Sequence, residues 1–229
     1  MDVSAMHMSD GLINAPVSAV FFAIAALGLA AALPRARMEL DEKTAPLAGL
    51  VAAFVFALQM INFPVLPGVS GHVLGGALAA ILVGPATAAL CLTVVLVVQA
   101  LLFADGGLTA LGMNITNMAL VGVAAGYGTA VAVRPLIRRF PGLSSIGIVA
   151  FAASVVATVM AATGFLIEYA VGGTAGSLGT IAPYLIGVHV LIGIGEGVIT
   201  AMTVMAVARA RPDLVYLLRP LRSLDRSPA

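Results

Sequence analysis

The sequence has few of the charged residues that a soluble protein needs. Only 9% of its 229 residues are Asp, Glu, Lys or Arg, whereas 61% are hydrophobic and the mean hydropathy is +1.12. A soluble domain carries about 25% charged residues, so this chain lacks the side chains to cover a surface in water. The composition excludes a soluble domain and indicates a protein that crosses a membrane several times.

Cysteine, tryptophan and the common enzyme motifs are also missing or scarce. Trp is absent, and Cys91 is the single cysteine, so no disulfide can form within the chain. The sequence contains no Walker A loop, no HExxH and no GxSxG. Residues 1–14 lack the basic segment of a signal peptide, and the next apolar run is long enough to span. If transport is active, its energy is expected from other subunits or from a gradient.

Long apolar runs account for most of what is present. An α-helix needs about 20 apolar residues to cross the bilayer core. We predict six such spans and one shorter apolar run, at 73–84, which is tolerated at membrane depth where protein covers it. The six predicted spans are 15–33, 47–63, 86–103, 115–133, 146–169 and 181–208.

The basic residues predict the orientation. All 11 fall in three clusters, and cytoplasmic loops hold an excess of Lys and Arg. The clusters share one side only if the 73–84 run crosses. The prediction is an all-α membrane bundle with about seven crossings, its N-terminus outside and its C-terminus cytoplasmic. The clusters are Arg35, Arg37 and Lys43; Arg134, Arg138 and Arg139; and Arg209, Arg211, Arg219, Arg222 and Arg226.

This topology divides the chain into three parts and leaves an acidic outer side. We predict an outer N-terminal segment (1–14), a transmembrane bundle (15–208) and a basic cytoplasmic tail (209–229). The charged residues left outside favour the arrival of cations, although the orientation rule alone would leave the same result. They are Asp2, Asp10, Asp105 and Glu168.

Polar groups at membrane depth are costly, so they are candidates for function. His7 stands between Met6 and Met8 before the first span, and His72 ends a loop rich in Pro and Gly. A histidine in an outer loop is more often a solvated side chain. Two of the chain's three histidines on one predicted side make a shared site a stronger interpretation.

A second polar group crowds the outer side between two spans. Asn114 and Asn117 are three residues apart, so they share a face of a helix, with Asp105 and Thr109 just before them. The ordinary role of such residues in a membrane bundle is hydrogen bonding between helices. The ten methionines are scattered through the spans and are interpreted as core filler.

A third polar group lies on the last predicted span. His189 and Glu196 share one helix face with Gly193 and Thr200. This row fits either a path for a cation or a structural polar seam packed on glycine.

The histidines suggest transition-metal chemistry. Imidazole suits Ni, Cu, Co and Zn better than Mg or Ca. A histidine at position two of a mature chain offers its imidazole, its deprotonated backbone amide and the terminal amine to one metal in a plane, and a distant imidazole completes four nitrogens. Such planar sites suit Ni(II) and Cu(II). Because the amine of Met6 must then be free, we predict that translation starts at Met6 or that residues 1–5 are removed.

Several stretches resemble one family of transport proteins. "MHMSDGL" resembles the N-terminal Met-His-x-x-Asp-Gly signature of the CbiM/NikM family. "NFPVLPGVSGHVLGGALAAILVGP", "QALLFADGGLTALGMNITNMALVG" and "GVHVLIGIGEGVIT" are similar to that family too, so the resemblance covers most of residues 6–200. Its members are substrate-binding membrane subunits of energy-coupling-factor transporters for cobalt or nickel. They lack ATPase activity and work with a transmembrane coupling subunit, two ATPase subunits and often a small accessory membrane subunit.

The resemblance implies a site as well as an activity. It implies Co(II) or Ni(II) as transported ion, no permanently bound cofactor, and a prokaryotic plasma membrane, with the metal feeding cobalamin synthesis or nickel enzymes. It also implies metal ligands at Met6, His7 and His72, with the N-terminal segment plugged into the bundle. The five residues MDVSA depart from the family pattern. Residues expected to orient the ligands or line a path are Asp10, Asp105, Asn114, Asn117, His189 and Glu196.

Two other functions stay open at the level of sequence. One is a self-sufficient exchanger of divalent metal for protons that uses Glu196. The other is an intramembrane hydrolase with a metal centre, for which the paired-ligand motif with an adjacent general base is missing. The proposed ligands would accept both cobalt and nickel.

Overall fold

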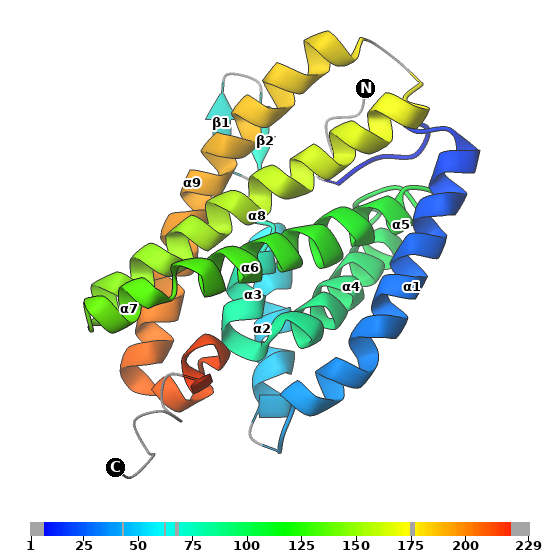
Figure 1. Ribbon diagram of the computed structural model, residues 1–229. Coiled ribbons are helices and arrows are strands. Elements are labelled where there is room, and N and C mark those ends of the chain that lie inside the picture. Colours follow the sequence, from blue (N-terminus) through cyan, green and yellow to red (C-terminus); the bar gives the residue numbers. More distant parts are fainter. Residues whose placement is uncertain (1–6, 43, 62, 67–68, 175–176, 221–229) are drawn as a thin grey trace.

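The chain folds into a bundle of helices that run between two ends (Figure 1). This computed structural model describes residues 7–42, 44–61, 63–66, 69–174 and 177–220, so Met6 lies outside it. Within the described residues, five helical runs are long and apolar enough to cross a membrane, and a sixth apolar helix, α2 (Thr44–Gln59), is shorter. The long runs are α1 (Ala15–Glu39), α4 (Pro85–Leu102), Leu111–Arg139, α8 (Leu143–Gly172) and α9 (Leu178–Ala210).

The predicted helical membrane bundle is confirmed, and each predicted span overlaps one of these helices. The prediction for 47–63 runs too far, because α2 ends at Gln59. The chain then forms a short hairpin of β1 (Phe63–Leu66) and β2 (Val69–Gly71), with Pro64 opposite Ser70. The apolar composition of this stretch fits helix and strand alike, while its prolines interrupt a helix.

The run from Leu111 to Arg139 is not a uniform α-helix. It consists of α5 (Leu111–Asn114), the π-helix η1 (Ile115–Gly122), α6 (Val123–Val133) and α7 (Pro135–Arg139). π-Helical turns are rare and frequently occur at functional sites. Periodicity in the sequence predicts a helix here but gives no sign of the wider turn.

The short apolar run forms the helix α3 (Gly76–Val83), and all of its residues are buried. Helices α2, α4, α6, α8 and α9 surround it. The chain enters α3 through Gly75 and leaves it through Gly84, both of which have the positive φ values that favour glycine (82° and 97°). The prediction of a short helix covered by protein is confirmed.

The C-terminal turns fold under the bundle. After α9 come two single turns, η2 (Pro212–Leu214) and η3 (Tyr216–Leu218). Val215, Leu217 and Leu218 are buried in the same hydrophobic core as α3. The first part of the predicted basic tail therefore carries apolar residues that complete the core.

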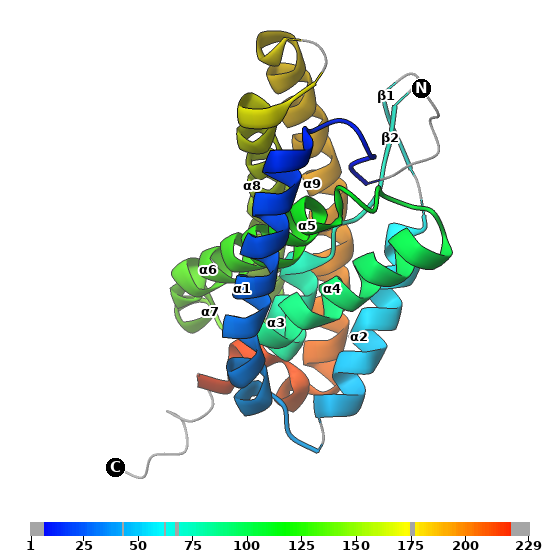
Figure 2. The same ribbon diagram turned by 90° about the vertical axis from the view of Figure 1, so that its right-hand side faces the viewer.

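The polar segments gather at the two ends of the bundle. The β1–β2 hairpin and the first described residues lie at one end, and the C-terminal turns lie at the other (Figure 2). The loops after α1 and α6 lie toward the C-terminal end, so the described members of all three basic clusters share that end. This arrangement is the one that the predicted orientation requires. The side of the membrane that each end faces stays a prediction.

Candidate metal centre

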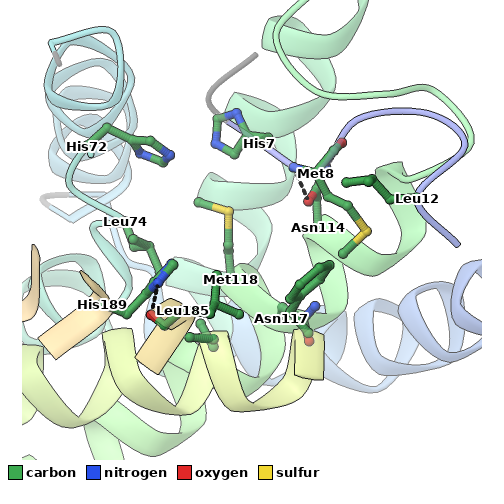
Figure 3. Close-up of a pocket in the computed structure, with 13 residues that line it drawn as sticks. His7, Met8, Leu12, His72, Leu74, Asn114, Asn117, Met118, Leu185 and His189 are labelled. Carbon is green, nitrogen blue, oxygen red and sulfur yellow. Dashed lines mark hydrogen bonds between the residues drawn. The ribbon is translucent and has the colours of Figure 1, made fainter. Parts of the chain in front are cut away.

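Two histidines from distant parts of the chain meet at the hairpin end of the bundle. The ring centroids of His7 and His72 lie 4.7 Å apart with 55° between the ring planes. Both residues are buried, and both line a cavity of about 200 Å³ (Figure 3). The structure thus brings these two histidines together, and their role as metal ligands stays a prediction.

Each imidazole has a defined partner at Nδ1. His72 Nδ1 lies 3.0 Å from the carbonyl oxygen of Val73, and since a carbonyl only accepts, Nδ1 carries the proton and Nε2 the lone pair. His7 Nδ1 lies at the ion-pair distance of 3.2 Å from Asp105 Oδ1, and no described residue forms a hydrogen bond with either ring nitrogen of His7. A carboxylate or carbonyl at the far nitrogen is how metal-binding imidazoles are commonly oriented.

The main chain around His7 is fixed by Asn114. The Asn114 side chain accepts a hydrogen bond from the Met8 nitrogen and donates one to the Met8 oxygen, both at 3.3 Å. The Gly107 nitrogen also donates to the Met8 oxygen, at 2.8 Å. At Gly106, where φ is +89°, a Cβ atom would lie 3.0 Å from the His7 Cβ, so the Asp105 loop approaches closely because it has glycine there.

Asp10 anchors the same segment to the loop before α5. Its Oδ1 accepts hydrogen bonds from the Thr109 nitrogen at 2.8 Å and the Thr109 hydroxyl at 2.6 Å. The Thr109 hydroxyl holds the pKa of the Asp10 carboxyl below its ordinary value of 3.8. The carboxylate therefore remains charged at neutral pH and keeps both hydrogen bonds.

The later part of the N-terminal segment is bonded to the end of α8. Thr174 donates from its hydroxyl to the Gly11 oxygen at 2.7 Å and from its nitrogen to the Leu12 oxygen at 3.1 Å. The Asn14 nitrogen donates to the Gly172 oxygen at 2.8 Å. The segment from His7 to Asn14 is thus packed into the hairpin end of the bundle.

Of the other predicted residues, Asn117 and His189 line the cavity and Glu196 does not. Asn117 donates from Nδ2 to Glu168 Oε2 at 2.8 Å. His189 Nδ1 lies 2.8 Å from the Leu185 carbonyl oxygen, so its Nε2 also carries a lone pair. Asn114 and Asn117, whose spacing predicted a shared helix face, both line the cavity. Glu196 instead contacts the start of α3.

Sequence reasoning missed several residues of the site. Met8 and Met118 line the cavity, although the methionines were interpreted as filler. Gln59 and Thr174 hold its walls through main-chain contacts that no local pattern indicates. Across the described residues, no three His, Cys, Asp or Glu side chains converge as metal ligands.

The comparisons with known proteins agree on one family of membrane transport proteins. A putative metal transport protein of Haloquadratum walsbyi is 39% identical over 214 residues, covering 92% of this chain and 94% of that protein. A putative fused nickel transport protein NikMN of Archaeoglobus fulgidus is 40% identical over 211 residues, covering 92% of this chain and 68% of that protein.

A solved structure and a family model extend this agreement. The crystal structure of a truncated transition metal transporter superposes with a TM-score of 0.76 at 29% identity, covering 90% of this chain and 99% of that one. The family model described as a cobalt uptake substrate-specific transmembrane region matches residues 7–214. That range begins at the first histidine of the candidate site and ends within the turns that close the core. The chain therefore belongs to the CbiM family of cobalt and nickel transport membrane proteins.

Proposed function

We propose that this protein is the substrate-binding subunit of an ATP-driven energy-coupling-factor transporter that takes up cobalt or nickel ions. The main observation in support is the pair of buried imidazoles, His7 and His72, at the end of the bundle away from the basic clusters. Nitrogen ligands of this kind suit Co(II) and Ni(II). Under the predicted orientation, that end faces the outside of a prokaryotic plasma membrane.

Two binding geometries are possible with these residues. In the first, His7 and His72 both bind the ion through Nε2 while Asp105 and the Val73 carbonyl hold their Nδ1 atoms. In the second, Met6 has a free amine, and that amine, the backbone nitrogen of His7 and its Nδ1 form a planar chelate that His72 completes. The chelate requires the His7 ring to turn away from Asp105, because only Nδ1 is close enough to its own backbone nitrogen to close the ring.

The length of the mature N-terminus distinguishes these geometries. Intact-mass measurement of the native protein establishes whether it starts at Met1 or Met6. A chain that starts at Met6 is expected to bind Ni(II) in the diamagnetic planar form, whereas the chain from Met1 is expected to use the two Nε2 atoms and give a paramagnetic complex. A native chain that retains Met1 and still binds Ni(II) in the planar form would contradict the assignment of the amine as ligand.

Replacing His72 tests the site itself. In calorimetric titrations with Co(II), Ni(II) and Zn(II), His72→Ala is expected to lose about hundredfold or more in affinity, since even losing a support of a metal ligand costs 10–100-fold. His189→Ala, which alters the same cavity but keeps both proposed imidazole ligands, is expected to bind within about tenfold of the wild type. Unchanged binding by His72→Ala would remove the basis of the proposal.

The source of energy is tested by transport. We propose as partners a transmembrane coupling subunit, two ATPase subunits and a small accessory membrane subunit. Uptake of radioactive cobalt or nickel is expected only in cells that express the coupling and ATPase subunits with this chain. Metal uptake into liposomes that contain this protein alone, driven by a proton gradient, would favour the exchanger.

A further inference from the structure

The four residues from His72 to Gly75 connect the metal centre to α3, and their conformation is fixed by side chains and main chain together. The His72 ring bonds to the Val73 carbonyl, as described above. Gln59 of α2 donates from Nε2 to the Leu74 oxygen at 2.7 Å. Gly75 has a φ of +82°, and a Cβ atom there would lie 2.6 Å from Val55 Cγ1. This segment is therefore held in one conformation against α2.

Glu196 of α9 binds the same segment from the other side. Its Oε2 accepts a hydrogen bond from the Leu74 nitrogen at 2.8 Å, and its Oε1 accepts one from the Gly75 nitrogen at 3.0 Å. These nitrogens belong to the two residues just before α3, the second of which is its N-cap, and a carboxylate at the start of a helix is favoured by the helix dipole. The residue is 0% exposed, so these contacts are its immediate surroundings and not a solvated face.

A third donor completes the surroundings of this carboxylate. The Thr158 hydroxyl of α8 lies 3.0 Å from Glu196 Oε2 and also 3.0 Å from the Ser154 carbonyl oxygen, so its one proton is shared between them. Both carboxylate oxygens are thus directed at donors from the fold.

We propose that Glu196 is a positioning residue for the metal centre, which holds the His72 ring at its place beside His7 through the main chain of residues 74 and 75. This inference rests on the proposed function, because it assigns Glu196 a role in metal binding by His72. Glu196 acts two residues away from the ligand and does not touch the ion. This positioning role differs from the interpretation in which Glu196 itself binds the metal along a cation path.

A second buried carboxylate, Glu39, lies at the opposite end of the bundle and serves as a matched control for Glu196. Its carboxylate also accepts from two main-chain nitrogens at the start of a helix, those of Ala86 at 3.1 Å and Thr87 at 2.7 Å in the first turn of α4. Glu39 lies beyond the far end of α3 from His72. Substitution at Glu39 therefore removes a comparable carboxylate from the start of a helix without reaching the metal centre.

The test compares Glu196→Gln, Glu39→Gln and His72→Ala with the full-length wild type, using Ni(II) and Co(II) titration, the Co(II) absorption spectrum and thermal unfolding. Glutamine keeps the shape but turns an NH2 group toward one of the two N–H donors. Both glutamine variants are expected to lose thermal stability. Only Glu196→Gln is expected to lose about 10–100-fold in metal affinity and to change the Co(II) spectrum.

A milder substitution of Glu196 allows the same test if Glu196→Gln does not fold. Glu196→Asp keeps the acceptor chemistry but draws the carboxylate back by one methylene, so it is also expected to weaken metal binding and change the spectrum. Wild-type affinity and spectrum in a folded Glu196 variant, with His72→Ala still inactive in binding, would overturn this inference alone. Failure of the wild type to bind either metal, or normal binding by His72→Ala, would instead overturn the proposed function.

Discussion

At the scale of single residues, the candidate centre depends on a few hydrogen bonds made across long stretches of chain. Composition and spacing were enough to select His7 and His72, because the chain has only three histidines. They did not show that Asn114 forms hydrogen bonds with the main chain of Met8, a residue 106 positions away in the sequence. Glu39 was missed as well, since it stands among charged residues at the end of α1 while its own carboxylate is buried.

The amide of Asn114 gives a prediction at this scale. Asn114→Leu removes both hydrogen bonds to Met8, so the His7 segment is expected to loosen and metal affinity to fall by about tenfold. Titration with Ni(II) measures this change.

Asn14→Ala is the control for this measurement. It removes the cap of α1, in which the Asn14 side chain accepts from the Val17 nitrogen at 3.1 Å, and should cost about 1 kcal/mol of stability with little effect on affinity. An equal loss of affinity in the two variants would mean that the hydrogen bonds between Asn114 and Met8 have no specific role in metal binding.

At the scale of helices, the sequence predicted where apolar runs lie but not how their backbones are built. The π-helix η1 interrupts a stretch predicted as one continuous helix, and the hairpin β1–β2 forms where the sequence indicates only a loop rich in Pro and Gly. Periodicity reports which faces are apolar, and it does not report the size of a helical turn. The burial of α3, in contrast, was predictable, because eight apolar residues are too few to cross a bilayer and need cover from protein.

The contact between α5 and α1 gives a prediction at this scale. A Cβ atom on Gly112 would lie 2.6 Å from the Phe22 nitrogen, which is main chain and cannot move aside as a side chain can. Gly112→Ala is therefore expected to force α1 outward and to lower the thermal unfolding temperature. The loss should be of the order of 1–3 kcal/mol, the usual range for overpacking.

Gly128→Ala in α6 is the matched control. A Cβ atom there would meet nothing within 4 Å, so the change should be neutral or slightly stabilising by the helix preference for Ala over Gly. If both variants unfold alike, the close approach of α5 and α1 is not what limits stability.

At the scale of the whole molecule, the described members of the three basic clusters and the two histidines lie at opposite ends of the bundle. Charge counting predicted that the clusters share an end, and the alternation of helices brings them there. The same counting could not predict that Val215, Leu217 and Leu218 turn back into the core, because the surrounding sequence is polar and basic.

The sidedness of the membrane is the prediction at this scale. In a Cys91→Ala background, Leu108→Cys and Met38→Cys place a thiol at exposed positions near opposite ends of the bundle, where the native side chains are 51% and 78% exposed. A membrane-impermeant maleimide is expected to label position 108 in intact cells and position 38 only in inside-out vesicles. The reverse pattern would place the histidine pair on the cytoplasmic side.

The hydrogen bonds between the N-terminal segment and the end of α8 have a consequence for biosynthesis. The later part of the His7 segment, residues 11–14, is bonded to Gly172 and Thr174, which are translated more than 150 residues later. The stretch from Gly11 to Asn14 therefore stays without these hydrogen bonds until the end of α8 has been made. A ribosome that stalls before Gly172 would leave a membrane-inserted fragment in which Asn114 can already bond to Met8 while residues 11–14 still lack their partners.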